Sequence, residues 1–176
     1  LADLHGGLSP DVEAREVVGR VGRKIVRAME IDESDFRFDF NLFADTRIAN
    51  AYALPGGQVF ITEAMYRMLE GEDLLAGILC HEIGHVVARH STEQIANDKV
   101  FRQFSMDDVM ESGDTKGNGD AQMTLLIDAM VHPKYGVEEE IECDKLAVRF
   151  LMQSGYAPEA LVHVLELLRE QGADDP

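Results

Sequence analysis

Residues 74–87 of the 176-residue chain read LLAGILCHEIGHVV. Apolar residues occupy most positions around the predicted helix, which indicates a buried element, and we expect that helix to run from Glu72 to His90. Its polar residues include His81, Glu82 and His85, in a His-Glu-x-x-His pattern. Burying two imidazoles and a carboxylate is costly unless they find partners inside the fold.

A shared metal ion would supply that partner. Histidines four residues apart lie on the same helix face, so His81 and His85 can reach one Zn²⁺ at about 2.0–2.1 Å. Glu82 lies beside the pair and can take a proton from the attacking water. Gly84 weakens the helix but leaves room for another segment to pack closely behind the metal. The pattern also arises by chance on amphipathic helices, but the buried setting favours one Zn²⁺ per chain with Glu82 as catalytic base.

A catalytic zinc ion needs a third protein ligand and one open position. Metzincins have Gly and His three and six residues past the second histidine, where this chain has Ala88 and Ser91. Thermolysin-like enzymes have a Glu about twenty residues past it, where this chain has Phe104 and Ser105. These two arrangements are therefore excluded, and the third ligand must lie further along the chain.

Residues 138–144 read EEEIECD and begin another predicted helix, over about 137–153. Acids in a first helical turn often serve only to complement the helix dipole. Apolar residues further along show, however, that part of this helix is buried. Glu140 and Asp144 share one face, so one could bind zinc while the other orients a histidine ligand. Spacing alone does not choose among the acids here.

Hydrophobic periodicity predicts the remaining elements. We expect helices over about 10–30, 62–69, 91–104, 121–131 and 158–171, strands over about 36–42, 49–54 and 58–62, and a mobile loop over 112–120. The sum is an α+β domain, mostly helical, with one small and mostly antiparallel sheet.

Composition excludes several classes of function. Lys and Arg number 16 against 33 Asp and Glu, a net charge of −17 that repels nucleic acids and anionic lipids. Two cysteines, Cys80 and Cys143, are too few for a disulfide framework, and we expect buried free thiols.

No apolar run approaches the about 20 residues that span a bilayer. Of the other histidines, we expect His5 to be terminal and exposed, and His90 to point elsewhere on the helix as a structural residue.

Three stretches together resemble a known family. Residues 50–62 read NAYALPGGQVFIT, residues 81–90 contain the His-Glu-x-x-His pattern followed by RH, and residues 140–144 read EIECD, with GYAP at 155–158. In this order they resemble the zinc metalloendopeptidases of the HtpX, Oma-type and CAAX prenyl protease group, peptidase family M48. Cys143 stands where that family has Ala, a change that we expect to be harmless.

The resemblance implies a zincin-like (gluzincin) fold, with Glu140 as the third zinc ligand and Asp144 as the residue that orients a ligand. It also implies that an edge strand binds an extended peptide substrate, through Asn50, Ala51, Tyr52, Ala53 and Leu54. We accordingly expect residues 1–176 to form a single zinc metallopeptidase catalytic domain that lacks segments at both ends.

The activity implied is hydrolysis of peptide bonds in unfolded or extended polypeptides, in protein quality control of the bacterial envelope, with a periplasmic location. Membrane association would come only through segments absent from this chain. The alternative is a zinc-bearing, chaperone-like binding module with little proteolytic activity. The family's His-Pro…Arg element, some forty residues past the third ligand, has no counterpart before Pro176, so His132, Tyr135 and His163 are weak candidates for stabilising the transition state.

Overall fold

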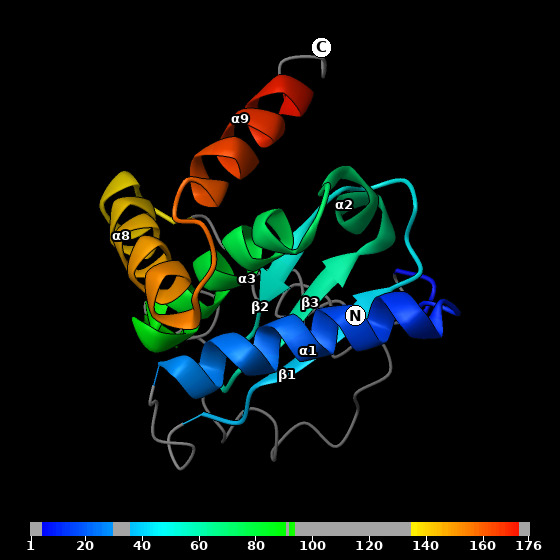
Figure 1. Cartoon of the computed structure of the whole chain (residues 1–176), viewed down its shortest axis with the longest axis horizontal. Coiled ribbons are helices and arrows are strands. Elements are labelled where there is room, and N and C mark those ends of the chain that lie inside the picture. Colours follow the sequence, from blue (N-terminus) through cyan, green and yellow to red (C-terminus); the bar gives the residue numbers. More distant parts are fainter. Residues whose placement is uncertain (1–4, 30–35, 91, 94–134, 173–176) are drawn as a thin grey trace, which may run out of the picture.

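The computed structural model describes residues 5–29, 36–90, 92–93 and 135–172 (Figure 1). The elements are α1 (Val12–Ala28), β1 (Asp39–Phe43), β2 (Ala51–Ala53), β3 (Gln58–Thr62), α2 (Glu63–Met68), α3 (Glu72–Val87), α8 (Val137–Ser154) and α9 (Ala160–Gly172). The helices expected over 91–104 and 121–131, and the loop over 112–120, lie outside the described residues. The described part confirms an α+β architecture that is mostly helical.

Local capping chemistry sets the helix limits. The Asp11 side chain accepts a hydrogen bond of 2.9 Å from the backbone N–H of Ala14 and so begins α1. Thr62 begins α2 in the same way, accepting from the N–H of Met65 at 3.2 Å. Gly155 ends α8 in the left-handed conformation, with φ 73°. These helices match the predicted ones to within a few residues.

The sheet has the order β1-β3-β2, with β1 parallel to β3 and β2 antiparallel to β3. The expectation of a mostly antiparallel sheet is therefore wrong. Residues 44–50 carry the chain past the end of β3, so that β2 lies on the far side of β3 from β1. Consecutive strands with a short connection usually pair directly, which is why the sequence pattern misled.

The two edges of this sheet differ. Residues 7–9 run along β1, where the Ser9 N–H donates to the Leu42 carbonyl at 2.8 Å and the Ala44 N–H donates to the Gly7 carbonyl at 3.0 Å. In the described sheet β2 is the opposite edge strand, as expected for Asn50 to Leu54.

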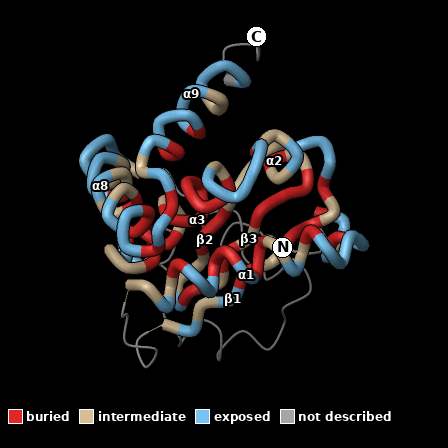
Figure 2. The backbone as a smooth tube through the Cα atoms, viewed as in Figure 1, coloured by how far each residue is buried: buried red, intermediate tan, exposed pale blue. Residues whose placement is uncertain are grey.

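Helix α3 lies at the centre of the molecule, in contact with α1, α8, α9 and the strand β2 (Figure 1). Figure 2 shows that α3 is buried over most of its length, whereas the outer faces of α8 and α9 are exposed. Leu75, Leu79 and Ile83 are each at most 2% exposed. The buried helix predicted from the apolar run is confirmed.

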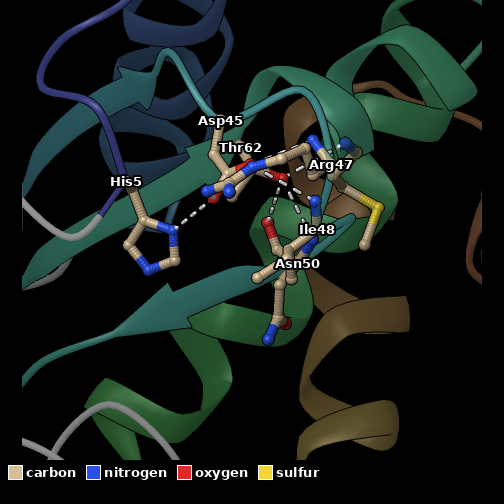
Figure 3. A network of polar contacts seen from close by, with 7 residues as sticks. His5, Asp45, Arg47, Ile48, Asn50 and Thr62 are labelled. Carbon is tan, nitrogen blue, oxygen red and sulfur yellow. Dashed lines mark hydrogen bonds and ion pairs between the residues drawn. The ribbon is translucent and has the colours of Figure 1, made fainter.

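A buried polar network holds the turn that leads into β2 (Figure 3). The Asp45 carboxylate accepts from the backbone N–H of Arg47 at 2.9 Å and lies 3.2 Å from Nδ1 of His5. The expectation that His5 is exposed is wrong, because its ring is buried and stacks on Phe43 with centroids 5.5 Å apart. Beyond this turn, the Asn50 N–H donates to Oγ1 of Thr62, which fixes the start of β2.

Both cysteines are buried free thiols, as expected. Among the helices that the structure describes, none combines the length and apolar character needed to cross a membrane.

Candidate metal centre and active site

Helix α3 places the two motif histidines one turn apart. The Nε2 atoms of His81 and His85 are 3.1 Å apart, and the rings meet edge-on, with centroids 4.8 Å apart and planes at 75°. His85 is buried, and burial lowers the pKa of its imidazole to about 3, with the neighbouring His81 and His90 acting in the same direction. The His85 ring is therefore neutral and has a lone pair to offer to a cation.

Helix α8 brings the acids predicted from the sequence to this pair. Oε2 of Glu140 lies 3.3 Å from Nε2 of His81, and its Oε1 lies 3.9 Å from Nε2 of His85. Oδ1 of Asp144 lies 3.0 Å from Nδ1 of His81, on the opposite side of that ring. The side chains that spacing alone could not separate thus have different places: Glu140 faces both histidines and Asp144 lies behind one.

A glycine permits this approach of the two helices. A Cβ atom on Gly84 would meet the Cα of Cys143 at 3.3 Å and its Cβ at 3.4 Å. These distances are tighter than ordinary van der Waals contact, so any side chain at position 84 would push α8 away from α3. The expectation that Gly84 admits a closely packed segment is confirmed.

The donor set fits a tetrahedral metal ion. Bonds of about 2.0–2.1 Å at tetrahedral angles place neighbouring donor atoms about 3.3 Å apart. The two Nε2 atoms are 3.1 Å apart, and Glu140 approaches His81 with Oε2 at 3.3 Å and His85 with Oε1 at 3.9 Å. One donor atom from each of the three residues lies within 4.8 Å of the other two. Asp144 can accept the Nδ1–H of His81, which leaves the Nε2 lone pair of that ring directed at the ion.

Glu82 lies beside this donor set and is half-buried. Burial raises the pKa of its carboxyl to about 7, while His81 lowers the pKa and Glu140 raises it further. A cation at the donor set would lower the pKa again by its charge. A carboxyl with a pKa near neutrality can both accept and return a proton.

A cavity of about 180 Å³ adjoins these groups. One side is polar and contains His81, Glu82 and Glu140, and Asn50 and Ala51 stand at the β2 edge. The other side is apolar and comes mainly from α9: its lining residues are Met65, Ile78, Leu161, Val164, Leu165 and Leu168. The cavity thus joins the β2 edge, the candidate base and an apolar wall.

The sequence did not reveal the place of His90. Helix α3 ends at Val87 instead of continuing to His90, and Arg89 adopts the left-handed conformation with φ 62°. This turn brings Nδ1 of His90 to 3.3 Å from Nδ1 of His85, so the expectation that His90 points elsewhere is wrong. A non-glycine residue with positive φ leaves no signal in hydrophobic periodicity.

The weak candidates for transition-state stabilisation separate in the structure. The Tyr135 ring stacks on His85, with centroids 3.9 Å apart and planes at 16°. His163 is exposed on α9 and lines a different groove, with Met68 and Leu74. His132 lies outside the described residues. Of the two that the structure describes, Tyr135 lies at the site and His163 does not.

Two histidines and a carboxylate around one point, beside a half-buried glutamate, define a site of the metallopeptidase class. A family model described as Peptidase family M48 matches residues 13–172. The chain belongs to peptidase family M48, whose members are metalloproteases.

Curated relatives agree with this membership. The chain is 32% identical over 143 residues to the mitochondrial metalloendopeptidase OMA1 of Schizosaccharomyces pombe. This alignment covers 81% of this chain and 40% of that protein. It is 29% identical over 142 residues to the beta-barrel assembly-enhancing protease of Escherichia coli K12, covering 76% of this chain and 28% of that protein. It is 22% identical over 145 residues to metalloprotease YcaL of the same organism, an alignment that covers 82% of this chain and 56% of that protein. The matched region is thus well under two thirds of each relative.

Proposed function

We propose that this chain is a zinc-dependent endopeptidase of zincin-like (gluzincin) fold, with one Zn²⁺ held by His81, His85 and Glu140. The observation that carries the proposal is that these three donors lie within 4.8 Å of one another, and that two of them, His81 and Glu140, line one cavity together with Glu82. Three protein ligands leave a fourth position open, as catalytic zinc sites require, whereas structural sites usually have four. On this proposal residues 1–176 act as a single catalytic domain.

The chemistry divides between the ion and the chain. When bound, Zn²⁺ supplies Lewis acidity toward water and toward the scissile carbonyl. Glu82 accepts the proton of the attacking water and delivers it to the leaving amine. Burial raises the pKa of this carboxyl in the metal-free protein, and the charge of a bound ion would lower it again, toward the ionised form that accepts a proton. Asp144 fixes the ring orientation of His81 throughout.

The substrate on this proposal is an unfolded or extended polypeptide. It would lie along β2 and its flanks, from Asn50 to Leu54, by strand addition. Ala51 and Glu82 line the same cavity, so a chain at this strand has its peptide bonds beside the base. The apolar wall formed by α9 would receive a hydrophobic substrate side chain next to the scissile bond.

The place of action is part of the same proposal. One relative is named for assembly of beta-barrel proteins and others are mitochondrial. We favour protein quality control in the bacterial envelope and a periplasmic location, because this chain is similar to the beta-barrel assembly-enhancing protease of a bacterium. Any attachment to a membrane would come through segments outside these 176 residues.

The test compares wild type with Glu82→Gln in the natural full-length product of the gene. Zinc content and cleavage of a reduced, alkylated protein are measured on both, with the exposed Glu138→Gln as a matched control. We expect Glu82→Gln to keep its zinc while the cleavage rate falls by about 10²–10⁴-fold, as for loss of a general base. Glu138→Gln should cleave like wild type.

The same experiment decides the alternative. If the zinc-loaded wild type binds the unfolded substrate but does not cleave it, the protein is a zinc-bearing binding module. An intact Glu82 argues against that function, because a purely structural zinc site does not need it.

A further inference from the structure

A second set of polar contacts lies behind His85, on the side away from Glu140. His90, from the turn after α3, and Glu142, from α8, form a chain that ends at the surface. We propose that His90 and Glu142 are a hydrogen-bonded relay that fixes the tautomer and ring orientation of His85 as a metal ligand. The proposal rests on the metal site assigned above and adds positioning residues to it.

The distances define the relay. Nδ1 of His85 is 3.3 Å from Nδ1 of His90, and Nε2 of His90 is 3.4 Å from Oε2 of Glu142. The side chains of His85 and His90 are 3% and 5% exposed, whereas that of Glu142 is 61% exposed. The contacts thus run from a buried ligand to a solvated carboxylate.

The metal fixes the direction of the hydrogen bonds. His85 faces His81 and Glu140 with Nε2, so a bound ion uses the Nε2 lone pair and the ring proton stays on Nδ1. That N–H donates to the unprotonated Nδ1 of His90. A neutral His90 then carries its proton on Nε2 and donates to the Glu142 carboxylate. Both hydrogen bonds require the proton of His85 on Nδ1 and that of His90 on Nε2. The relay therefore favours the His85 tautomer whose Nε2 lone pair is free to bind the ion.

The relay makes the support of the two ligands equivalent. Asp144 accepts directly from Nδ1 of His81 at 3.0 Å. Glu142 reaches His85 through one intervening imidazole. Both carboxylates and the ligand Glu140 belong to α8, so a single helix carries the third ligand and the anchors of the other two. Burying His85 without such an acceptor would leave its N–H unpaired, which would destabilise the folded state.

The same atoms could be interpreted as a second metal site, because Sγ of Cys143 lies 3.3 Å from Nδ1 of His90. Two observations favour the relay. A neutral imidazole has one lone pair, so a His85 that binds an ion through Nε2 keeps its proton on Nδ1 and cannot offer that nitrogen to a second ion. Burial also raises the pKa of the Cys143 thiol, which favours the neutral thiol over the thiolate that binds metal ions.

The first test replaces His90 by Asn and by Leu. An Asn side chain places an amide oxygen near the position of imidazole Nδ1, so it can accept the His85 N–H, whereas Leu fills the space and accepts nothing. We expect zinc affinity, measured by competition with a chromophoric chelator, to fall by about 10–100-fold in His90→Leu. His90→Asn should lose much less, and ¹⁵N-histidine NMR of the zinc form should show the His85 Nδ1–H in wild type and in His90→Asn.

The second test uses exposed positions, where misfolding is not a concern. Glu142→Ala and Glu138→Ala each remove one carboxylate from the outer surface of α8. Glu142→Ala should weaken zinc binding more than Glu138→Ala, with equal thermal stability of the metal-free proteins.

The outcomes are distinguishable. Wild-type zinc affinity in His90→Leu, or equal affinities in Glu142→Ala and Glu138→Ala, would overturn the relay. Two zinc ions per wild-type chain, with one lost in His90→Leu, would overturn it in favour of a second site. Failure of His81→Ala to lose zinc would instead overturn the metal site itself.

Discussion

Replacement of Gly84 by alanine tests how the two metal-binding helices are held together. The new Cβ would lie 3.3 Å from the Cα of Cys143, so the backbone of α8 must move by a few tenths of an ångström. Helix α8 carries Glu140 and Asp144, and the shift would draw both away from the histidines of α3. Zinc binding should therefore weaken even though no ligand has changed.

Gly77 offers a matched control on the same helix. A Cβ there would meet the backbone carbonyl atoms of Ala160 at 3.3 Å, which is equal crowding against α9. Each substitution gains about 1 kcal/mol of helix propensity and loses about 1–3 kcal/mol by overpacking. Both variants should thus be less stable by about 0–2 kcal/mol, or about 0–8 °C in Tm.

Zinc affinity separates the two variants. For Gly84→Ala we expect about a tenfold loss, the lower end of what disturbing a ligand's supporting groups costs. Gly77→Ala should bind zinc like wild type, because α9 contributes no ligand. Chelator competition measures the affinity, and thermal unfolding of the metal-free proteins measures the stability. Equal zinc affinities in the two variants would refute the reasoning.

Three further predictions concern single acids. Glu140→Gln keeps the shape of the side chain but should abolish tight zinc binding in an equilibrium dialysis measurement, and the exposed Glu138→Gln should not. Asp144→Asn should be milder, with about a 10–100-fold loss of metal affinity by chelator competition. Hydrogen bonds, led by that from the Arg47 N–H, hold the pKa of Asp45 below its ordinary value of 3.8. The Asp45 carboxylate therefore stabilises the fold above about pH 4, and this contribution is lost as the pH falls toward the folded-state pKa. The Tm difference between wild type and Asp45→Asn should accordingly be largest near neutral pH and shrink in acid; a difference that grows in acid would contradict the assigned network.

The sequence predicted those features that depend on local periodicity. The spacing of His81 and His85 placed both on one face of a buried helix, and the structure has them there. The four-residue offset of Glu140 and Asp144 likewise put both on the face that meets α3. Such patterns are legible because helix geometry alone fixes them.

Features that depend on tertiary structure were not predictable in the same way. The parallel pairing of β1 with β3 follows from the path of residues 44–50 around the sheet, which no strand pattern encodes. Burial of His5 depends on Asp45, forty residues later in the chain. The return of His90 to the metal site depends on one left-handed residue, Arg89. A histidine five residues past the motif was the available signal, but helical spacing pointed it in the wrong direction.

The most direct test of the central claim is a crystal structure of the zinc-loaded protein with anomalous data collected at the zinc edge. We expect one strong peak per chain, within about 2.0–2.2 Å of Nε2 of His81, Nε2 of His85 and a carboxylate oxygen of Glu140. A peak bound instead by His90 and Cys143, or by Glu142 in place of Glu140, would contradict it.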